Sequence, residues 1–271
     1  MKTHVEFKNL GIDLLMNRRL IEFDAFGGGI YYYAVIICVG FLLAYLYINH
    51  EEKKFTKSDD LTNILIIGIP VGVISARIYY VIFSFADYKD SLSDIFKIWE
   101  GGLAVYGGVI GAVLTVLIYC RIKKLSALHY LDLAAMGFLI GQCVGRWGNF
   151  VNGEAHGSVC GESFILGMYV NGEGPYHPTF LYESVLNLLG FLLILFLSRK
   201  INYVGFRANC YLIWYGLVRF FIEGLRTDSL YIPGTLIRVS QALSALMFLS
   251  GIIIMAFTVK KQRKKKKLHL T

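Results

Sequence analysis

The feature that most constrains the fold of this sequence is a series of seven long apolar stretches. A helix needs about 20 predominantly apolar residues to cross the roughly 30 Å of hydrocarbon in a bilayer. Hydrophobic residues make up 56% of the 271 positions and charged residues 17%, which excludes an ordinary soluble domain. We therefore predict an all-α, polytopic integral membrane protein with seven transmembrane helices. They cover roughly residues 29–48, 62–84, 102–120, 128–147, 178–198, 208–225 and 236–259.

The basic residues are distributed unevenly between the two ends of these spans. Because cytoplasmic loops carry an excess of Lys and Arg, we expect the N-terminus outside and the C-terminus in the cytoplasm. The net charge of +8 is mostly this orientation signal, and nothing indicates a nucleic-acid partner. On the predicted cytoplasmic side lie Lys53, Lys54, Lys57, Arg121, Lys123, Lys124, Arg199, Lys200, Arg207, Lys260, Lys261, Arg263, Lys264, Lys265, Lys266 and Lys267.

Composition divides the chain into three parts. Residues 1–28 lack a signal-peptide pattern, and their stretch "LGIDLLMNRRLIEF" mixes apolar and charged residues, which is typical of an amphipathic segment on the outer surface. Residues 29–259 form the seven-span domain, with an outer loop at about 148–177. Residues 260–271 form a basic cytoplasmic tail that could contact anionic lipid.

In this orientation, six of the spans carry their unusual polar or small residues at the outer end. An ionisable side chain at mid-membrane costs roughly 2.5–3.5 kcal/mol on insertion scales, so such residues are expected to face a wet cavity and to mark function. One cavity open to the outside accounts for all of them. The residues assigned to it are Tyr33, Arg77, Tyr106, Gly107, Gly108, Arg146, Asn149, Asn152, Glu154, His177, Tyr215, Arg219, Glu223 and Arg226.

Each element also has a simpler interpretation. The tyrosines that begin the first span could form an aromatic belt, and the glycines that begin the third could serve helix packing alone. Arg219 and Glu223 are four residues apart and could neutralise each other on one helix face. His177 could simply precede a helix that begins at Pro178. The depth that these residues share favours the cavity.

The predicted cavity contains more basic than acidic residues. The basic residues are Arg77, Arg146, Arg219 and Arg226, and the acidic residues are Glu154, Glu183 and Glu223. Arginine stays protonated, and its planar fork of donors matches a phosphate or a carboxylate. The ligand that suits such a membrane cavity is an anion with an apolar body, which is a phospholipid. Asn149 and Asn152 could bind its ester or hydroxyl oxygens.

The segment "GRWGNFVNGEAHG", from Gly145 to Gly157, resembles the signature of the prolipoprotein diacylglyceryl transferases. That signature is Gly-Arg-x-Gly-Asn-Phe, an apolar residue, then Asn-x-Glu-x-x-Gly, and every fixed position is present. Further similarity lies in "HPTFLYE", in "YGLVRFFIEGLR", in "IWEGGLAVYGG", and in Tyr33, which is followed by Ala34 where the family usually has glycine. The resemblance extends over nearly the whole chain.

The resemblance implies a bacterial cytoplasmic-membrane enzyme with seven spans and an outward N-terminus. Members transfer the diacylglyceryl group of phosphatidylglycerol to the thiol of the lipobox cysteine in the signal peptide of a prolipoprotein, and glycerol phosphate is released. They use no metal and no organic cofactor. The sequence agrees, since it contains neither a metal-ligand spacing such as HExxH nor a nucleotide-binding loop.

The resemblance and the chemistry together assign the residues their functions. Negative charge grows on the departing phosphate, and fixed positive donors there lower the barrier. Arg146 and Arg219 match family positions tied to phosphatidylglycerol binding and catalysis, and Asn149 matches one tied to binding. Glu154 and Glu223 would orient the arginines. Tyr215 also matches a functional family tyrosine.

The sequence departs from the family pattern at Tyr106, where the family motif reads His-Gly-Gly and this chain has Tyr106-Gly107-Gly108. The histidine has been regarded as the base for the thiol, but a phenol has a reference pKa of about 10. Tyr106 could donate a hydrogen bond to the headgroup, another group such as Glu223 or His177 could accept the proton, or the protein could be inactive. We favour the hydrogen bond. A second departure is Phe180, where the family often has glutamine.

Two other classes of protein also gather polar residues in their spans. A lipid transporter should show internal repeats and charges near the midplane, and neither is found here. A phospholipid-binding scaffold without catalytic activity would keep the arginines, and only the signature argues against it.

Overall fold

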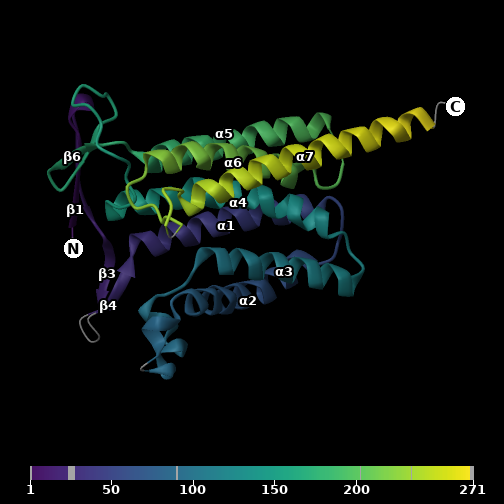
Figure 1. Cartoon of the computed structure of the whole chain (residues 1–271), viewed down its shortest axis with the longest axis horizontal. Coiled ribbons are helices and arrows are strands. Elements are labelled where there is room, and N and C mark those ends of the chain that lie inside the picture. The colour runs from purple at the N-terminus through teal and green to yellow at the C-terminus, as the bar shows by residue number, and fades with distance from the viewer. Residues whose placement is uncertain (1, 24–27, 90, 202, 233, 269–271) are drawn as a thin grey trace. The chain divides into compact units, whose positions relative to one another are not determined.

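Helices dominate the computed structural model, which describes residues 2–23, 28–89, 91–201, 203–232 and 234–268 (Figure 1). Within these residues, six helices are long and apolar enough to cross a membrane. This confirms the prediction of an integral membrane protein built from helices. The six are α1 (Tyr32–Lys53), α2 (Asp60–Phe83), α3 (Val105–Lys123), α4 (Ala127–Asn152), α5 (Thr179–Lys200) and α7 (Val239–Leu268).

A seventh helix, α6 (Phe206–Leu225), forms where the sixth span was predicted, but it is not among these six. Its sequence contains Arg219 and Glu223, which reduce its apolar character. It runs beside α5 and α7 (Figure 1). Gly216 permits close approach to α7, since a Cβ there would lie 2.7 Å from the carbonyl oxygen of Ser244. Seven spans therefore remain a prediction.

The chain forms two compact units, one of residues 1–48 with 134–271 and one of residues 49–133. In the smaller unit, α2 and α3 pack together. A Cβ on Gly107 would lie 2.5 Å from the carbonyl oxygen of Ser75, and one on Gly111 would lie 2.5 Å from the Ser75 hydroxyl. The simpler interpretation of these glycines, close helix packing, therefore describes Gly107 and Gly111.

The larger unit contains a small antiparallel sheet that the all-α prediction omitted. Its strands are β1 (Lys2–Phe7), β2 (Ile12–Asn17), β5 (Met168–Val170) and β6 (Glu173–Tyr176), in the order β2-β1-β5-β6. Val5 and Phe7 alternate with His4 and Glu6, and the apolar pair is buried against Met168, Val170 and Phe180. Because β1 pairs with a segment more than 160 residues away, no local sequence pattern predicted the sheet.

A second pair of strands, β3 (Arg19–Phe23) and β4 (Gly28–Tyr31), leads directly into α1. The segment predicted to be amphipathic, residues 1–28, is thus largely extended; residues 1 and 24–27 lie outside the described part. At the other end, α7 continues to Leu268, so most of the expected basic tail prolongs this helix. Residues 269–271 of that tail lie outside the described residues.

Candidate functional site

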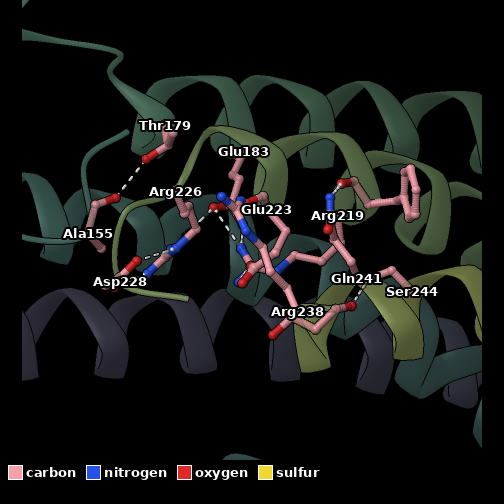
Figure 2. A network of polar contacts seen from close by, with 12 residues as sticks. Ala155, Thr179, Glu183, Arg219, Glu223, Arg226, Asp228, Arg238, Gln241 and Ser244 are labelled. Carbon is pink, nitrogen blue, oxygen red and sulfur yellow. Dashed lines mark hydrogen bonds and ion pairs between the residues drawn. The ribbon is translucent and has the colours of Figure 1, made fainter. Parts of the chain in front are cut away.

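A buried carboxylate, Glu183 on α5, lies at the centre of a group of arginines (Figure 2). The Nη2 of Arg146 lies 2.6 Å from Glu183 Oε2, and the Nη1 of Arg219 donates to both carboxylate oxygens at 3.2 Å. The Nη1 of Arg226 lies 3.7 Å from Oε1. Only 4% of the Glu183 side chain is exposed, so its charge requires such partners. Glu183 thereby joins α4, α5 and the end of α6.

Arg219 also binds a second buried carboxylate on its own helix. Its Nη2 lies 2.5 Å from Glu223 Oε2, one turn further along α6. The interpretation that these two residues neutralise each other is therefore correct but incomplete, because the same guanidinium bridges Glu223 and Glu183. One turn before Arg219, the ring of Tyr215 stacks on Tyr211 at 5.3 Å. The i, i+4 spacing places Tyr215, Arg219 and Glu223 on one helix face.

The "GRWGNFVNGE" motif closes α4 and connects its polar side chains. Arg146 Nη1 donates to Asn149 Oδ1 at 3.2 Å, and Asn149 Nδ2 donates to Glu154 Oε1 at 3.2 Å. Asn152 Nδ2 donates to the same oxygen at 3.1 Å. The helix ends as the chain turns at Gly153, whose φ of +64° favours glycine. Glu154 thus orients Arg146 through Asn149 rather than directly.

Tyr33, on α1, lies against this motif. A Cβ on Gly148 would lie 2.6 Å from Cδ2 of Tyr33, so only glycine leaves room for the ring. Gly148 thereby positions the predicted binding tyrosine. The departure from the family pattern at Phe180 also has a packing reason, because its ring stacks on Phe150 at 4.5 Å and lies 5.5 Å from Trp147. It joins the apolar core under the sheet.

Arg226 connects the cluster to the loop that follows α6. Its Nε and Nη2 donate to the carboxylate of Asp228 at 2.9 and 2.6 Å (Figure 2). Burial raises the pKa of Asp228, but the hydrogen bonds and charge of Arg226 outweigh burial and hold this pKa below its usual value. The pair is therefore ionised. Backbone bonds tie the loop that follows α4 to this end of α6, since Ser158 N donates to the carbonyl of Leu225 at 2.6 Å.

His177 precedes α5, and its described ring contacts are with neighbouring aromatic residues. Its Nδ1 lies 3.2 Å from the hydroxyl of Tyr182, and its ring centroid lies 5.2 Å from that of Phe164. Within the described part of the chain, no hydrogen bond or ion pair joins this ring to the arginine cluster. The simpler interpretation, a cap on a helix that begins at Pro178, is wrong, because α5 begins at Thr179 and Pro178 takes the N-cap position. A substrate-binding function for His177 stays a prediction.

Arg77, in the C-terminal half of α2, has a different environment from the other arginines. Its Nε donates to the carbonyl of Ile95 at 2.8 Å, and its two terminal nitrogens donate to four further carbonyls between residues 94 and 102, at 2.6 to 3.4 Å. These bonds use all five of its N–H donors. Arg77 therefore shapes the segment that leads into α3. A substrate-binding function for Arg77 stays a prediction.

Tyr106, Gly107 and Gly108 belong to the smaller unit, at the start of α3. The contacts given for the arginine cluster join residues of the larger unit, namely Arg146, Asn149, Asn152, Glu154, Glu183, Arg219, Glu223 and Arg226. That Tyr106 and the two glycines share the same cavity stays a prediction.

Sequence reasoning assigns no function to Glu183, the residue at the centre of the cluster. Glu183 was counted among the cavity acids, and the "HPTFLYE" similarity marked it, but neither signal showed that three arginines share it. Asp228 and Arg238 were missed entirely, because they lie outside the recognisable motifs. An acid inside an apolar span was the available signal for Glu183.

The arrangement is suited to hold an anion beside apolar surface. Several guanidinium groups are held in place by carboxylates, so they are oriented before any ligand binds, and this is the geometry that stabilises developing negative charge. The side chains that contact Glu183 are the guanidinium groups of Arg146, Arg219 and Arg226.

Comparison with known proteins agrees with this chemistry. Residues 21–257 match the family model described as prolipoprotein diacylglyceryl transferase. A protein of Streptococcus equi subsp. equi named phosphatidylglycerol–prolipoprotein diacylglyceryl transferase is 44% identical over 244 residues, which cover 87% of this chain and 92% of that protein. A protein of the same name from Lactobacillus delbrueckii subsp. bulgaricus is 43% identical over 239 residues, covering 83% and 86%.

Proposed function

Because the chain belongs to the prolipoprotein diacylglyceryl transferase family, we propose that its arginine cluster binds the phosphate of phosphatidylglycerol during transfer. The protein is a membrane transferase that acts in lipoprotein maturation and moves the diacylglyceryl group of phosphatidylglycerol to prolipoproteins. One observation supports the assignment of Arg146 and Arg219 to phosphate binding. Arg146 and Arg219, from different helices, meet on one buried carboxylate and are thereby held ready for a shared anion.

The bonds that change define what the site must do. The sulfur of the lipobox cysteine attacks the glycerol carbon that carries the phosphate, a C–S bond forms, and the C–O bond to the phosphate breaks. The bonding electrons pass to the phosphate oxygen, and glycerol phosphate leaves. Arg146 and Arg219 stabilise the charge that grows there, and Asn149, Asn152 and Arg226 contact the headgroup. Removing one such donor typically costs about 3–4 kcal/mol of transition-state stabilisation.

Glu183 and Glu223 keep the arginines oriented while the site is empty. A phosphate that enters shares their guanidinium donors rather than meeting an unpaired charge, so little reorganisation is needed. The thiol has a reference pKa of about 8.5, and neighbouring guanidinium groups favour the thiolate. Strong general-base catalysis is therefore not required.

Transfer is tested with purified protein in phosphatidylcholine nanodiscs that contain phosphatidylglycerol, together with a lipobox peptide. We expect glycerol phosphate release and a peptide whose mass increases by one diacylglyceryl group. A peptide with serine in place of the lipobox cysteine should give neither product. Lipid binding without release would instead identify a scaffold. Movement of lipid between leaflets without a modified peptide would identify a transporter.

We also infer that α6 is the sixth of seven spans, with the N-terminus outside and the C-terminus in the cytoplasm of a bacterial cell. The one-sided distribution of Lys and Arg supports this orientation. Residue 162 lies in the predicted outer loop and is exposed, so Glu162→Cys should react with an impermeant maleimide from outside. Burial raises the pKa of the Cys160 thiol, so Cys160 is a poorer reporter and is replaced by serine. Labelling only from the cytoplasmic face would reverse the topology.

Tyr106 contributes a hydrogen bond to the bound headgroup in this mechanism. Tyr106→Phe should then lose about 1–2 kcal/mol of transition-state stabilisation. This loss corresponds to a decrease in kcat/KM of about fivefold to thirtyfold. Tyr106→His should stay active, because imidazole can also donate. Loss of more than about a thousandfold in Tyr106→Phe, with phosphatidylglycerol still bound, would make Tyr106 the proton acceptor.

A further inference from the structure

Arg238, in the segment just before α7, is an arginine of this network to which the mechanism above gives no function (Figure 2). Arg146, Arg219 and Arg226 each have at least one carboxylate partner. In the described part of the chain, Arg238 has no carboxylate within ion-pair distance. Its positive charge is therefore not balanced by a neighbouring acid, although the residue is half-buried.

The guanidinium of Arg238 is nevertheless fixed in place beside the cluster. Its Nε donates to the hydroxyl of Tyr231 at 3.3 Å, and its Nη1 donates to the main-chain carbonyl of Glu223. Glu223 is the residue whose side chain holds Arg219. Among the described residues, the Nη2 of Arg238 has no protein acceptor within hydrogen-bond distance. A fixed and partly unbonded guanidinium thus stands next to the proposed phosphate site.

A partly desolvated cation without a counter-charge is unfavourable until an anion binds to it, and a guanidinium binds phosphate strongly through its fork of donors. We propose that Arg238 is a phosphate-binding residue that selects an anionic headgroup over a zwitterionic one. A zwitterionic headgroup carries its own cation and so gains less from this charge. The proposal rests on the transferase function above. The phosphate is that of phosphatidylglycerol or that of the free glycerol phosphate product.

The test varies the mole fraction of phosphatidylglycerol in phosphatidylcholine nanodiscs. Arg238→Gln keeps an N–H donor at the position of Arg238 Nε, whose partner is the Tyr231 hydroxyl, but it has lost the charge and the terminal nitrogens. KM should therefore rise about tenfold while kcat stays within about twofold. Arg238→Lys keeps the charge without the planar fork and should show an intermediate KM. Raising the salt concentration should increase KM in the wild type more than in Arg238→Gln.

Gln241→Ala is the matched control. Gln241 Nε2 donates to the carbonyl of Phe220 at 3.2 Å, so this variant removes another bond from α7 to the last turns of α6 without any change of charge. Its KM should stay within about twofold of the wild type. An equal rise of KM in Gln241→Ala, or a lower kcat with unchanged KM in Arg238→Gln, would overturn the proposal and leave Arg238 a purely structural residue.

Inhibition by free glycerol 1-phosphate separates the two sources of the phosphate. Weaker inhibition of Arg238→Gln supports contact with the phosphate of lipid and product alike, whereas unchanged inhibition alongside a raised KM supports contact with the lipid headgroup alone. Direct binding separates this proposal from the transferase function. Phosphatidylglycerol should raise the melting temperature of the wild type more than that of Arg238→Gln, even if no glycerol phosphate is released. Equal stabilisation of both would contradict the proposal.

Discussion

Replacing Glu183 by glutamine is expected to lower kcat/KM by about a hundredfold to a thousandfold, because two arginines that stabilise the departing phosphate lose their common anchor. The carboxylate binds Arg146 at 2.6 Å and Arg219 at 3.2 Å, and glutamine keeps the shape but not the charge. Removing one partner of a buried ion pair typically costs about 3–5 kcal/mol of stability. We therefore also expect a lower melting temperature. Glycerol phosphate release and thermal denaturation in nanodiscs measure the two effects.

Glu52 offers a matched control for this substitution. It is another fully buried glutamate, but the contact of its Oε1 is with the main-chain N–H of Leu61, at 3.0 Å. Glu52→Gln should therefore leave kcat/KM within about twofold of the wild type, whatever it does to stability. Folded Glu183→Gln with kcat/KM within about threefold of the wild type would show that the arginines need no central carboxylate.

Arg146→Lys is expected to lower turnover by about one to two orders of magnitude, because lysine keeps the charge but loses the planar fork. The guanidinium uses separate nitrogens for separate partners, Nη2 for Glu183 and Nη1 for Asn149. A compact ammonium cannot hold both of these and a phosphate in the same geometry. Initial rates of glycerol phosphate release over a range of phosphatidylglycerol fractions will separate the loss in kcat from the change in KM.

The same substitution at Arg18 is the control, since Arg18 Nε donates to the hydroxyl of Thr3 in β1 and not to the cluster. Arg18→Lys should keep turnover within about twofold of the wild type. Near-normal release by Arg146→Lys would mean that the "GRWGNFVNGE" motif has only a structural function.

Part of the site was predictable because its information is local. The i, i+4 spacing of Arg219 and Glu223 places them on one helix face in any helical structure, and their ion pair followed. The signature placed Arg146, Asn149 and Glu154 together, and the structure connects them in that order. The same local information could not distinguish Arg77 from the other arginines. Its partners are backbone carbonyls of the loop before α3, and the path of that loop cannot be predicted from the sequence alone.

Sequence by itself determined the membrane character of this protein, the positions of its long helices and its family, because apolar length, charge distribution and motif spacing are properties of the chain alone. Only the tertiary structure decided that Glu183 is shared by arginines of different segments and that β1 pairs with β5. Contacts between distant segments depend on the rotation of each helix about its axis and on how closely glycines let helices approach. Those quantities are fixed by packing, which no single segment encodes.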